Sequence, residues 1–274
     1  MNFMKPILNT ILFFGLLSCL FSCRPAYLGA GLHGNEMTYW SKPTTRDSAK
    51  ITAVYASGNL TANSGYQAGD RLLLTQGAVY QSHTSKGANL SYGVFGYAGN
   101  YNVGTSRIPL DKYQGNYGLY GGGLRASFNF NANIFDNIDW RFIGIDMAYS
   151  REFGSLSNLR RSIPDSLVRK DNIQPNYDRD RIILLRSPEM FTWGFTSEIV
   201  FKGKNNERLA LKYFLGRSEQ NYQSIYANNI WHLGNLTLAY QNDKVMISAQ
   251  MAQLFSRPTI NMGFGYRLGS ERVR

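Results

Sequence analysis

Few side chains of this 274-residue chain have the chemistry for catalysis or metal binding. Both cysteines, Cys19 and Cys23, lie near the N-terminus, so the rest of the chain has no thiolate nucleophile, no disulfide and no Cys-based metal site. His33 and Glu36 stand three residues apart, which suits a metal pair on one helical turn, but nothing nearby supplies a third ligand. We therefore expect no metal, and we expect His33 and Glu36 to lie in a solvent-exposed linker.

The segment Gly29–Gly34 spells G-x-G-x-x-G, the pattern of dinucleotide sites. Such a site requires a strand before the glycines and a helix opening from them, and the sequence predicts neither. The net charge of +11 is spread along the chain and accompanies no recognisable nucleic-acid-binding module. We therefore expect neither a cofactor nor a nucleic acid as ligand.

The first 22 residues have the features of a secretory signal. Lys5 precedes the apolar run Ile11–Leu17, which is shorter than the about 20 residues of a membrane-spanning helix. Residues 20–23 (LFSC) resemble the lipobox of bacterial lipoproteins, which implies that Cys23 becomes the acylated first residue; residues 16–19 (LLSC) compete as a site. The expected organisation is a signal over 1–22, a periplasmic linker over 23–49 and a barrel domain over 50–274. The sequence leaves open whether residues 24–49 fold under the barrel or into its lumen.

The elements that follow residue 50 have the two-residue period of strands. Phe191, Phe195 and Ile199 share one parity, whereas Thr192 and Glu198 share the other. Around 72–74 and 92–101 neither parity dominates, so their faces stay unassigned. The sequence predicts ten strands, over 50–60, 70–82, 88–101, 115–131, 138–153, 189–203, 206–218, 230–242, 243–255 and 258–268.

The polar face of these strands is small, being rich in Gly, Ala, Ser and Asn, while the apolar face carries Leu, Ile and aromatic residues. Charged residues make up 17% of the chain, below the roughly 25% of soluble domains. Small inward and apolar outward residues are typical of membrane barrels. The expected fold is an all-β, antiparallel, up-and-down transmembrane β-barrel of about ten strands. A soluble β-rich envelope lipoprotein that binds a ligand or partner is the alternative.

Connection lengths alternate as they do in bacterial barrels, which have short periplasmic turns and long external loops. The connection at 257–258 is short where a long one is expected. This topology places both termini on the periplasmic side and the basic loop 154–188 outside, as a solvated segment near lipopolysaccharide. The expected short connections are 83–87, 132–137, 204–205 and 242–243, and the long ones are 102–114, 154–188 and 219–229.

Six charged residues interrupt the small polar faces. In a narrow barrel such side chains would pair across the lumen and close it. Alternatively they would line a narrow, weakly selective pore, because rings of charge set selectivity. The residues are Arg125, Asp146, Glu198, Arg208, Lys212 and Arg267.

The last predicted strand resembles the β-signal that the barrel-assembly machinery reads in outer-membrane proteins. The residues that carry the resemblance are Asn261, Gly263, Tyr266 and Leu268. Together with the lipobox and the Phe/Tyr/Asn-rich strands, they make the chain similar to outer-membrane barrels of Bacteroidota. The resemblance implies outer-membrane lipid and the assembly machinery as partners.

An enzymatic role is not expected. His83-Thr84-Ser85 spells the H-x-S of barrel lipid A deacylases, but it falls in a predicted periplasmic turn, whereas that family places its pair late, near the outer leaflet. His232 has no serine neighbour in sequence. We therefore expect a non-enzymatic, lipid-anchored barrel that serves as a structural or accessory envelope protein, with a narrow transport pore for small solutes as the alternative.

Overall fold

The structure is a computed structural model that describes residues 26–44, 50–63, 69–104, 111–135, 137–167, 182–203, 206–219, 233–254 and 257–273. The predicted signal, Cys19, Cys23 and His232 lie outside the described residues. No helix within the described ranges is long and apolar enough to cross a membrane.

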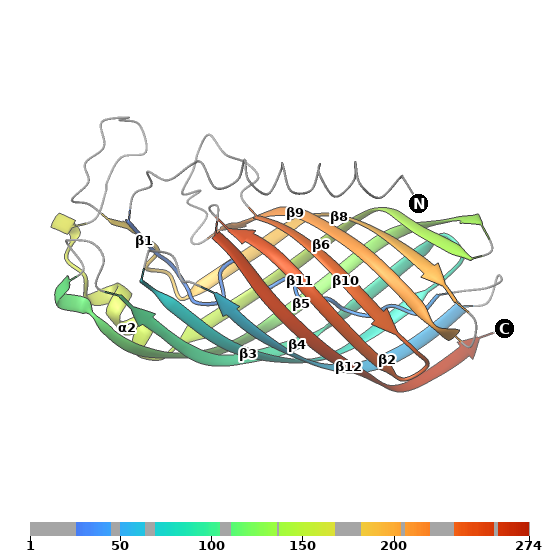
Figure 1. The fold of residues 1–274 in the computed structure, drawn as a ribbon, viewed down its shortest axis with the longest axis horizontal. Coiled ribbons are helices and arrows are strands. Elements are labelled where there is room, and N and C mark those ends of the chain that lie inside the picture. Colours follow the sequence, from blue (N-terminus) through green and yellow to red (C-terminus); the bar gives the residue numbers. More distant parts are fainter. Residues whose placement is uncertain are drawn as a thin grey trace, which may run out of the picture.

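Ten antiparallel strands close into one barrel, so the predicted fold class and strand number are confirmed. Each strand pairs with its neighbour along the chain, and the last strand pairs with the first, which leaves no free edge. Figure 1 shows the barrel from the side. Its strands are β2 (Lys50–Asn63), β3 (Arg71–Thr84), β4 (Ala88–Val103), β5 (Gly115–Phe135), β6 (Ile138–Phe153), β8 (Glu189–Lys202), β9 (Arg208–Glu219), β10 (Leu233–Gln241), β11 (Val245–Leu254) and β12 (Arg257–Val273).

The barrel has two unlike mouths. Long connections, including 104–114 and 154–188, join strands at one end, which we call the loop mouth; the two-residue connection between β11 and β12 at this mouth is the exception. Short connections such as 85–87 and 242–244 join them at the other end, which we call the turn mouth. Lys50 pairs with Val273 at the turn mouth, so β2 begins and β12 ends there. Strand β12 also extends past the predicted end at residue 268.

The alternation of apolar and small polar residues in the sequence corresponds to the outer and inner faces of the barrel wall. Side chains point alternately into the lumen, where they are buried, and outward, where large apolar groups are exposed. Leu124 and Met262 are clear examples of outward residues, since 61% and 65% of their surfaces are exposed. Every strand of the barrel contributes to this outer apolar surface, for example with Leu60, Leu73, Val94, Leu124, Ile145, Phe195, Leu211, Leu238, Ile247 and Met262.

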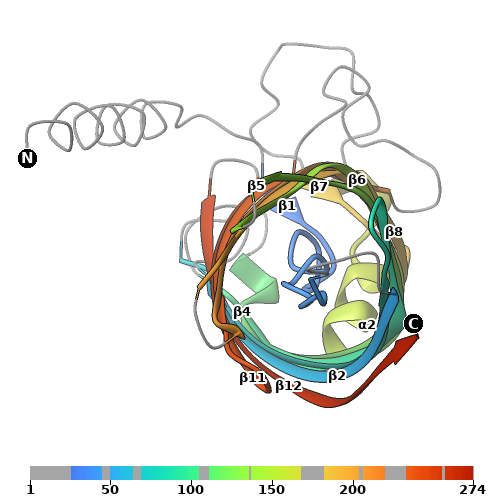
Figure 2. The same cartoon turned by 90° about the vertical axis from the view of Figure 1, so that its right-hand side faces the viewer.

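Several short elements lie within or over the loop mouth (Figure 2). The parallel pair β1 (Ala26–Leu28) and β7 (Ile182–Leu184) brings the start of the described chain beside the β6–β8 connection. The helix α2 (Ser155–Ser162) turns inward directly after β6, and its Leu156 is completely buried. Two single turns, η2 (Asp111–Tyr113) and η3 (Asp165–Leu167), complete the set.

Candidate functional site

Residues 28–44 fill the lumen and are the most informative part of the molecule. Every residue of this luminal segment is buried, although it forms neither a helix nor a strand beyond Leu28. It accounts for most of the predicted periplasmic linker over 23–49, which the structure instead places inside the barrel. Because the segment is buried, its polar groups depend on partners inside the barrel, and the barrel wall supplies several of them.

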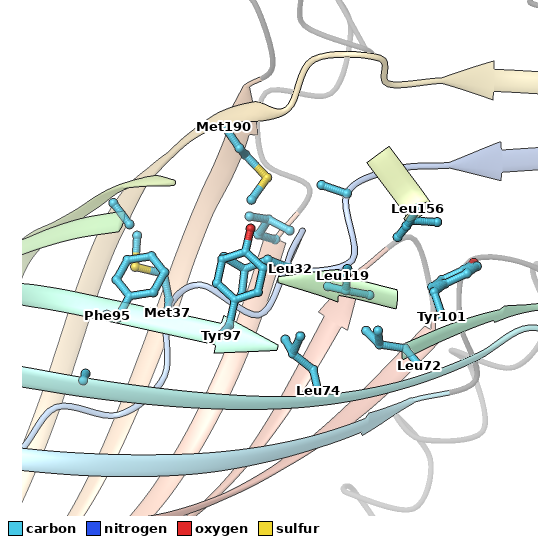
Figure 3. Close-up of a cluster of buried hydrophobic side chains, with 14 of the residues drawn as sticks. Leu32, Met37, Leu72, Leu74, Phe95, Tyr97, Tyr101, Leu119, Leu156 and Met190 are labelled. Atoms are coloured by element: carbon cyan, nitrogen blue, oxygen red, sulfur yellow. The ribbon is translucent and has the colours of Figure 1, made fainter. Parts of the chain in front are cut away.

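At the loop mouth the segment packs into an apolar core (Figure 3). Leu28, Leu32 and Met37 of the segment belong to one cluster with Leu72 and Leu74 of β3 and with residues of β4, β5 and α2. This cluster explains why no apolar parity was visible around residues 72–74 and 92–101. Those strands are apolar on both faces, because one face meets the luminal core and the other forms the outer surface. Their inward residues are Leu72, Leu74, Phe95, Tyr97 and Tyr101.

In the first described part of the connection after β6, residues 154–167, one side of the chain is exposed and the other is buried against the lumen. Gly154 has a φ of 109°, a conformation that favours glycine, and it turns the chain into α2. Arg160 of α2 is completely buried and binds Glu152 at 2.5 Å. The other carboxylate oxygen of Glu152 accepts a 2.7 Å hydrogen bond from the backbone N–H of Gly31. The helix and the luminal segment are thus tied to the same carboxylate.

Midway along the barrel, Trp40 packs against one side chain from β3 and one from β5. Its ring stacks on Tyr80 of β3, with centroids 4.4 Å apart and an interplanar angle of 3°. The Arg125 guanidinium of β5 lies 4.6 Å from the centroid of the Trp40 ring, within the range of a cation–π contact. The backbone N–H of Ser41 donates a 2.7 Å hydrogen bond to the Tyr80 hydroxyl. Aromatic stacking and backbone contacts therefore fix this part of the segment together.

Charged residues of β5, β6, β8 and β9 form two buried groups beside the segment. Asp146 accepts from Arg125 at 3.0 Å and from Lys212 at 2.6 Å, and its side chain has no exposed surface. Arg125 also donates to the Thr38 carbonyl. Glu198 pairs with Arg141 at 2.7 Å and accepts a 2.8 Å hydrogen bond from the Tyr39 hydroxyl. The charges pair with each other and with the segment, as expected for charges held away from water.

The other predicted lumen charges lie closer to the turn mouth. Arg208 donates a 3.4 Å hydrogen bond to the Lys42 carbonyl. Arg267 lies 3.8 Å from Asp243 at the rim, with part of its side chain exposed, and joins neither buried group. Lys42 itself donates to the Ser127 hydroxyl at 2.9 Å.

Sequence reasoning missed Arg141, which has the parity of outward residues in its strand. The pairing of β6 with β8 shifts register between Arg141 and Gly144. Such a bulge adds one residue to a strand and reverses the alternation beyond it. Arg141 therefore points inward, where it also donates to the carbonyls of Lys42 and Pro43 at 3.3 Å. The signal was weak, since a bulge leaves no distinctive residue pattern here.

His33 and Glu36 are buried in the lumen, and the expectation of a solvent-exposed position was wrong. Both residues are 1% exposed. The Glu36 carboxylate accepts hydrogen bonds from Thr192 at 2.9 Å and Ser218 at 3.1 Å. Among the described residues, no group of three or more His, Cys, Asp or Glu side chains is placed to hold a metal ion.

The H-x-S residues His83 and Ser85 each form hydrogen bonds with other groups. The two ring nitrogens of His83 lie 2.9 Å from the Thr52 hydroxyl and 3.2 Å from the Tyr92 hydroxyl. Ser85 donates instead to the carbonyl of Ala88. The predicted β-signal residues lie in β12, where Asn261 faces the lumen and Tyr266 and Leu268 face outward.

Comparisons with known proteins found structural neighbours only. No family model matches the chain, and no curated protein matches it. The KdgM porin is 10% identical with a TM-score of 0.31, covering 78% of this chain and 99% of its own. An outer membrane channel from Pseudomonas putida F1 is 8% identical with a TM-score of 0.40, covering 85% of this chain and 100% of its own. OprG from Pseudomonas aeruginosa is 8% identical with a TM-score of 0.33, covering 81% and 96%.

Proposed function

We propose that this chain is an outer-membrane β-barrel that is closed by its own N-terminal segment and serves as a structural or accessory envelope protein rather than as an enzyme. The observation that carries the proposal is the complete burial of residues 28–44 in the lumen. An apolar core at the loop mouth and paired charges farther along hold this segment. Both halves of the lumen are therefore occupied by protein.

The membrane location is supported by the outer surface. Large apolar side chains are exposed on all sides of a closed barrel, an arrangement that is costly in water and favourable in a bilayer. Soluble monomers rarely expose a continuous apolar surface of this kind, so we favour the membrane barrel over the soluble lipoprotein.

Three finer features belong to the same proposal. We propose that Cys23 carries the lipid, on the strength of residues 20–23 alone, and that the chain is of Bacteroidota type. We also propose that the barrel-assembly machinery reads β12 through Asn261, Gly263, Tyr266 and Leu268. Support for this last point is that β12 is the closing strand, which pairs with both β11 and β2.

Conductance of the full chain in a planar lipid bilayer tests the closed lumen. We expect no steady conductance, because ions would have to pass an apolar core and a segment without exposed residues. The preparation is first shown to be a folded barrel by its faster migration on a denaturing gel before boiling. Stable conductance steps at low voltage from such a preparation would contradict the proposal and favour the narrow pore, which requires residues 28–44 to leave the lumen.

A further inference from the structure

The direction of the luminal segment determines where the chain before it leaves the barrel. Ala26 pairs with Ile182 in the connection between β6 and β8, which belongs to the loop mouth. At the other end of the segment, the Pro43 carbonyl accepts a 3.0 Å hydrogen bond from Thr84, the last residue of β3. Thr84 lies at the turn mouth, next to the short connection 85–87. The segment therefore runs through the whole barrel.

Contacts along β6 and its neighbours show the same direction for the luminal segment, from the loop mouth to the turn mouth. Glu152, near the loop-mouth end of β6, binds the N–H of Gly31. Asp146, halfway along β6, binds Arg125, which in turn donates to the carbonyl of Thr38. Arg141, near the turn-mouth end, donates to the carbonyls of Lys42 and Pro43. The segment runs antiparallel to β6, with buried contacts at three levels of the lumen.

The two described ends of the protein consequently lie at opposite mouths. Strand β12 ends at Val273 beside Lys50, at the turn mouth, whereas Ala26 lies at the loop mouth, as Figure 1 shows for β1 and the C-terminus. This differs from the expectation that both termini share the periplasmic side. The difference arises because residues 28–44 pass through the barrel instead of extending away from it.

The geometry points to an N-terminus displayed on the outside of the cell, with any lipid on Cys23 entering the outer leaflet at the loop mouth. This inference rests on the proposed outer-membrane barrel, in which long connections face outward. Cys23 lies outside the described residues, but it precedes Ala26 by three residues. Three residues reach at most about 10 Å, and the apolar band of such a barrel is about 25 Å tall. A lipid-bearing Cys23 is therefore within reach of the leaflet at the loop mouth and not of the leaflet at the turn mouth.

The position of the lipid determines what the barrel does. A lipid attached at the periplasmic side would only tether the linker, whereas a lipid at the loop mouth would join the outer leaflet to a segment that fills the lumen. The barrel would then act as a conduit that presents its own lipid-bearing N-terminus at the cell surface. The partner of the anchor is accordingly the lipid of the outer leaflet.

The test is the accessibility of an epitope on intact cells. One variant of the full chain carries an epitope between Pro25 and Ala26, and a matched control carries the same epitope between Asp243 and Lys244 in a turn-mouth connection. An impermeant antibody is expected to bind the first on intact cells, and the second only after the outer membrane is permeabilised. Both variants are first checked for the heat-dependent gel shift of a folded barrel.

Other outcomes distinguish the failure of this inference from the failure of the proposed membrane barrel. If both epitopes bind only after permeabilisation, the N-terminus is periplasmic and the inference is overturned, while the membrane barrel stands. The inference is equally overturned if only the turn-mouth epitope binds on intact cells. Recovery of the protein in the soluble fraction without a heat-dependent shift would overturn the proposed membrane barrel and the inference together.

Discussion

The Asp146→Ala variant is expected to lose about 3–5 kcal/mol of unfolding free energy, because it removes the one partner shared by two buried cations. Asp146 binds Arg125 at 3.0 Å and Lys212 at 2.6 Å, with no exposed surface of its own. Arg125 also contacts Trp40, so the luminal segment should loosen as well. Denaturant titration of the folded barrel in detergent, followed by the heat-dependent gel shift, measures the loss.

An exposed ion pair that also involves a residue of β6 provides the control. Arg151 and Glu189 lie 3.7 Å apart on β6 and β8, with 55% and 44% of their side chains exposed. Such pairs contribute about 0–1 kcal/mol, so Glu189→Ala is expected to behave nearly as the parent. Equal losses in the two variants would show that the Asp146 group does not hold the lumen.

The second large effect concerns the outer surface. Phe195, midway along β8, points away from the lumen and is 41% exposed. A cationic residue near the midplane of a bilayer costs about 2–4 kcal/mol, so Phe195→Arg should assemble poorly and lose stability by that amount. If the same surface faced water, an arginine there would be tolerated. The measurement is the amount of heat-shifting barrel recovered from the outer-membrane fraction.

Phe201 provides the control for this prediction. It lies on the same strand and the same outer face, near the turn-mouth end, and it is 44% exposed. Near the interface the cost of a cation falls to about 0–1 kcal/mol, so Phe201→Arg should assemble almost normally. Near-parental assembly of both variants would contradict the membrane location.

The barrel itself was predictable because its wall has two chemically different faces. Phe195 outside and Glu198 inside are separated by parity alone, and the pattern repeats in most strands. Four of the predicted lumen charges, namely Arg125, Asp146, Glu198 and Lys212, also follow directly from it. Where the pattern failed, a physical reason is visible. Leu72 and Leu74 face an apolar luminal core, so both faces of β3 are apolar.

The luminal segment could not be predicted from local sequence. Residues 28–44 have no strand or helix period, because the segment is shaped by contacts with residues far away in the chain. Tyr39 meets Glu198, and Gly31 meets Glu152, across more than a hundred positions. Each contact needs only a hydroxyl or a backbone N–H, which no motif marks. The same holds for Arg141, whose inward position depends on a bulge.

The central claim, that the chain closes its own lumen, is tested most directly by a photoreactive phenylalanine analogue at Trp40. Its ring would lie against Tyr80 and beneath Arg125, so irradiation should link it to peptides of β3 or β5, as read by mass spectrometry. The same analogue at Phe264, which is 54% exposed on the outer face, should give no such links. Links from position 40 to other proteins, or none to the barrel wall, would contradict the account.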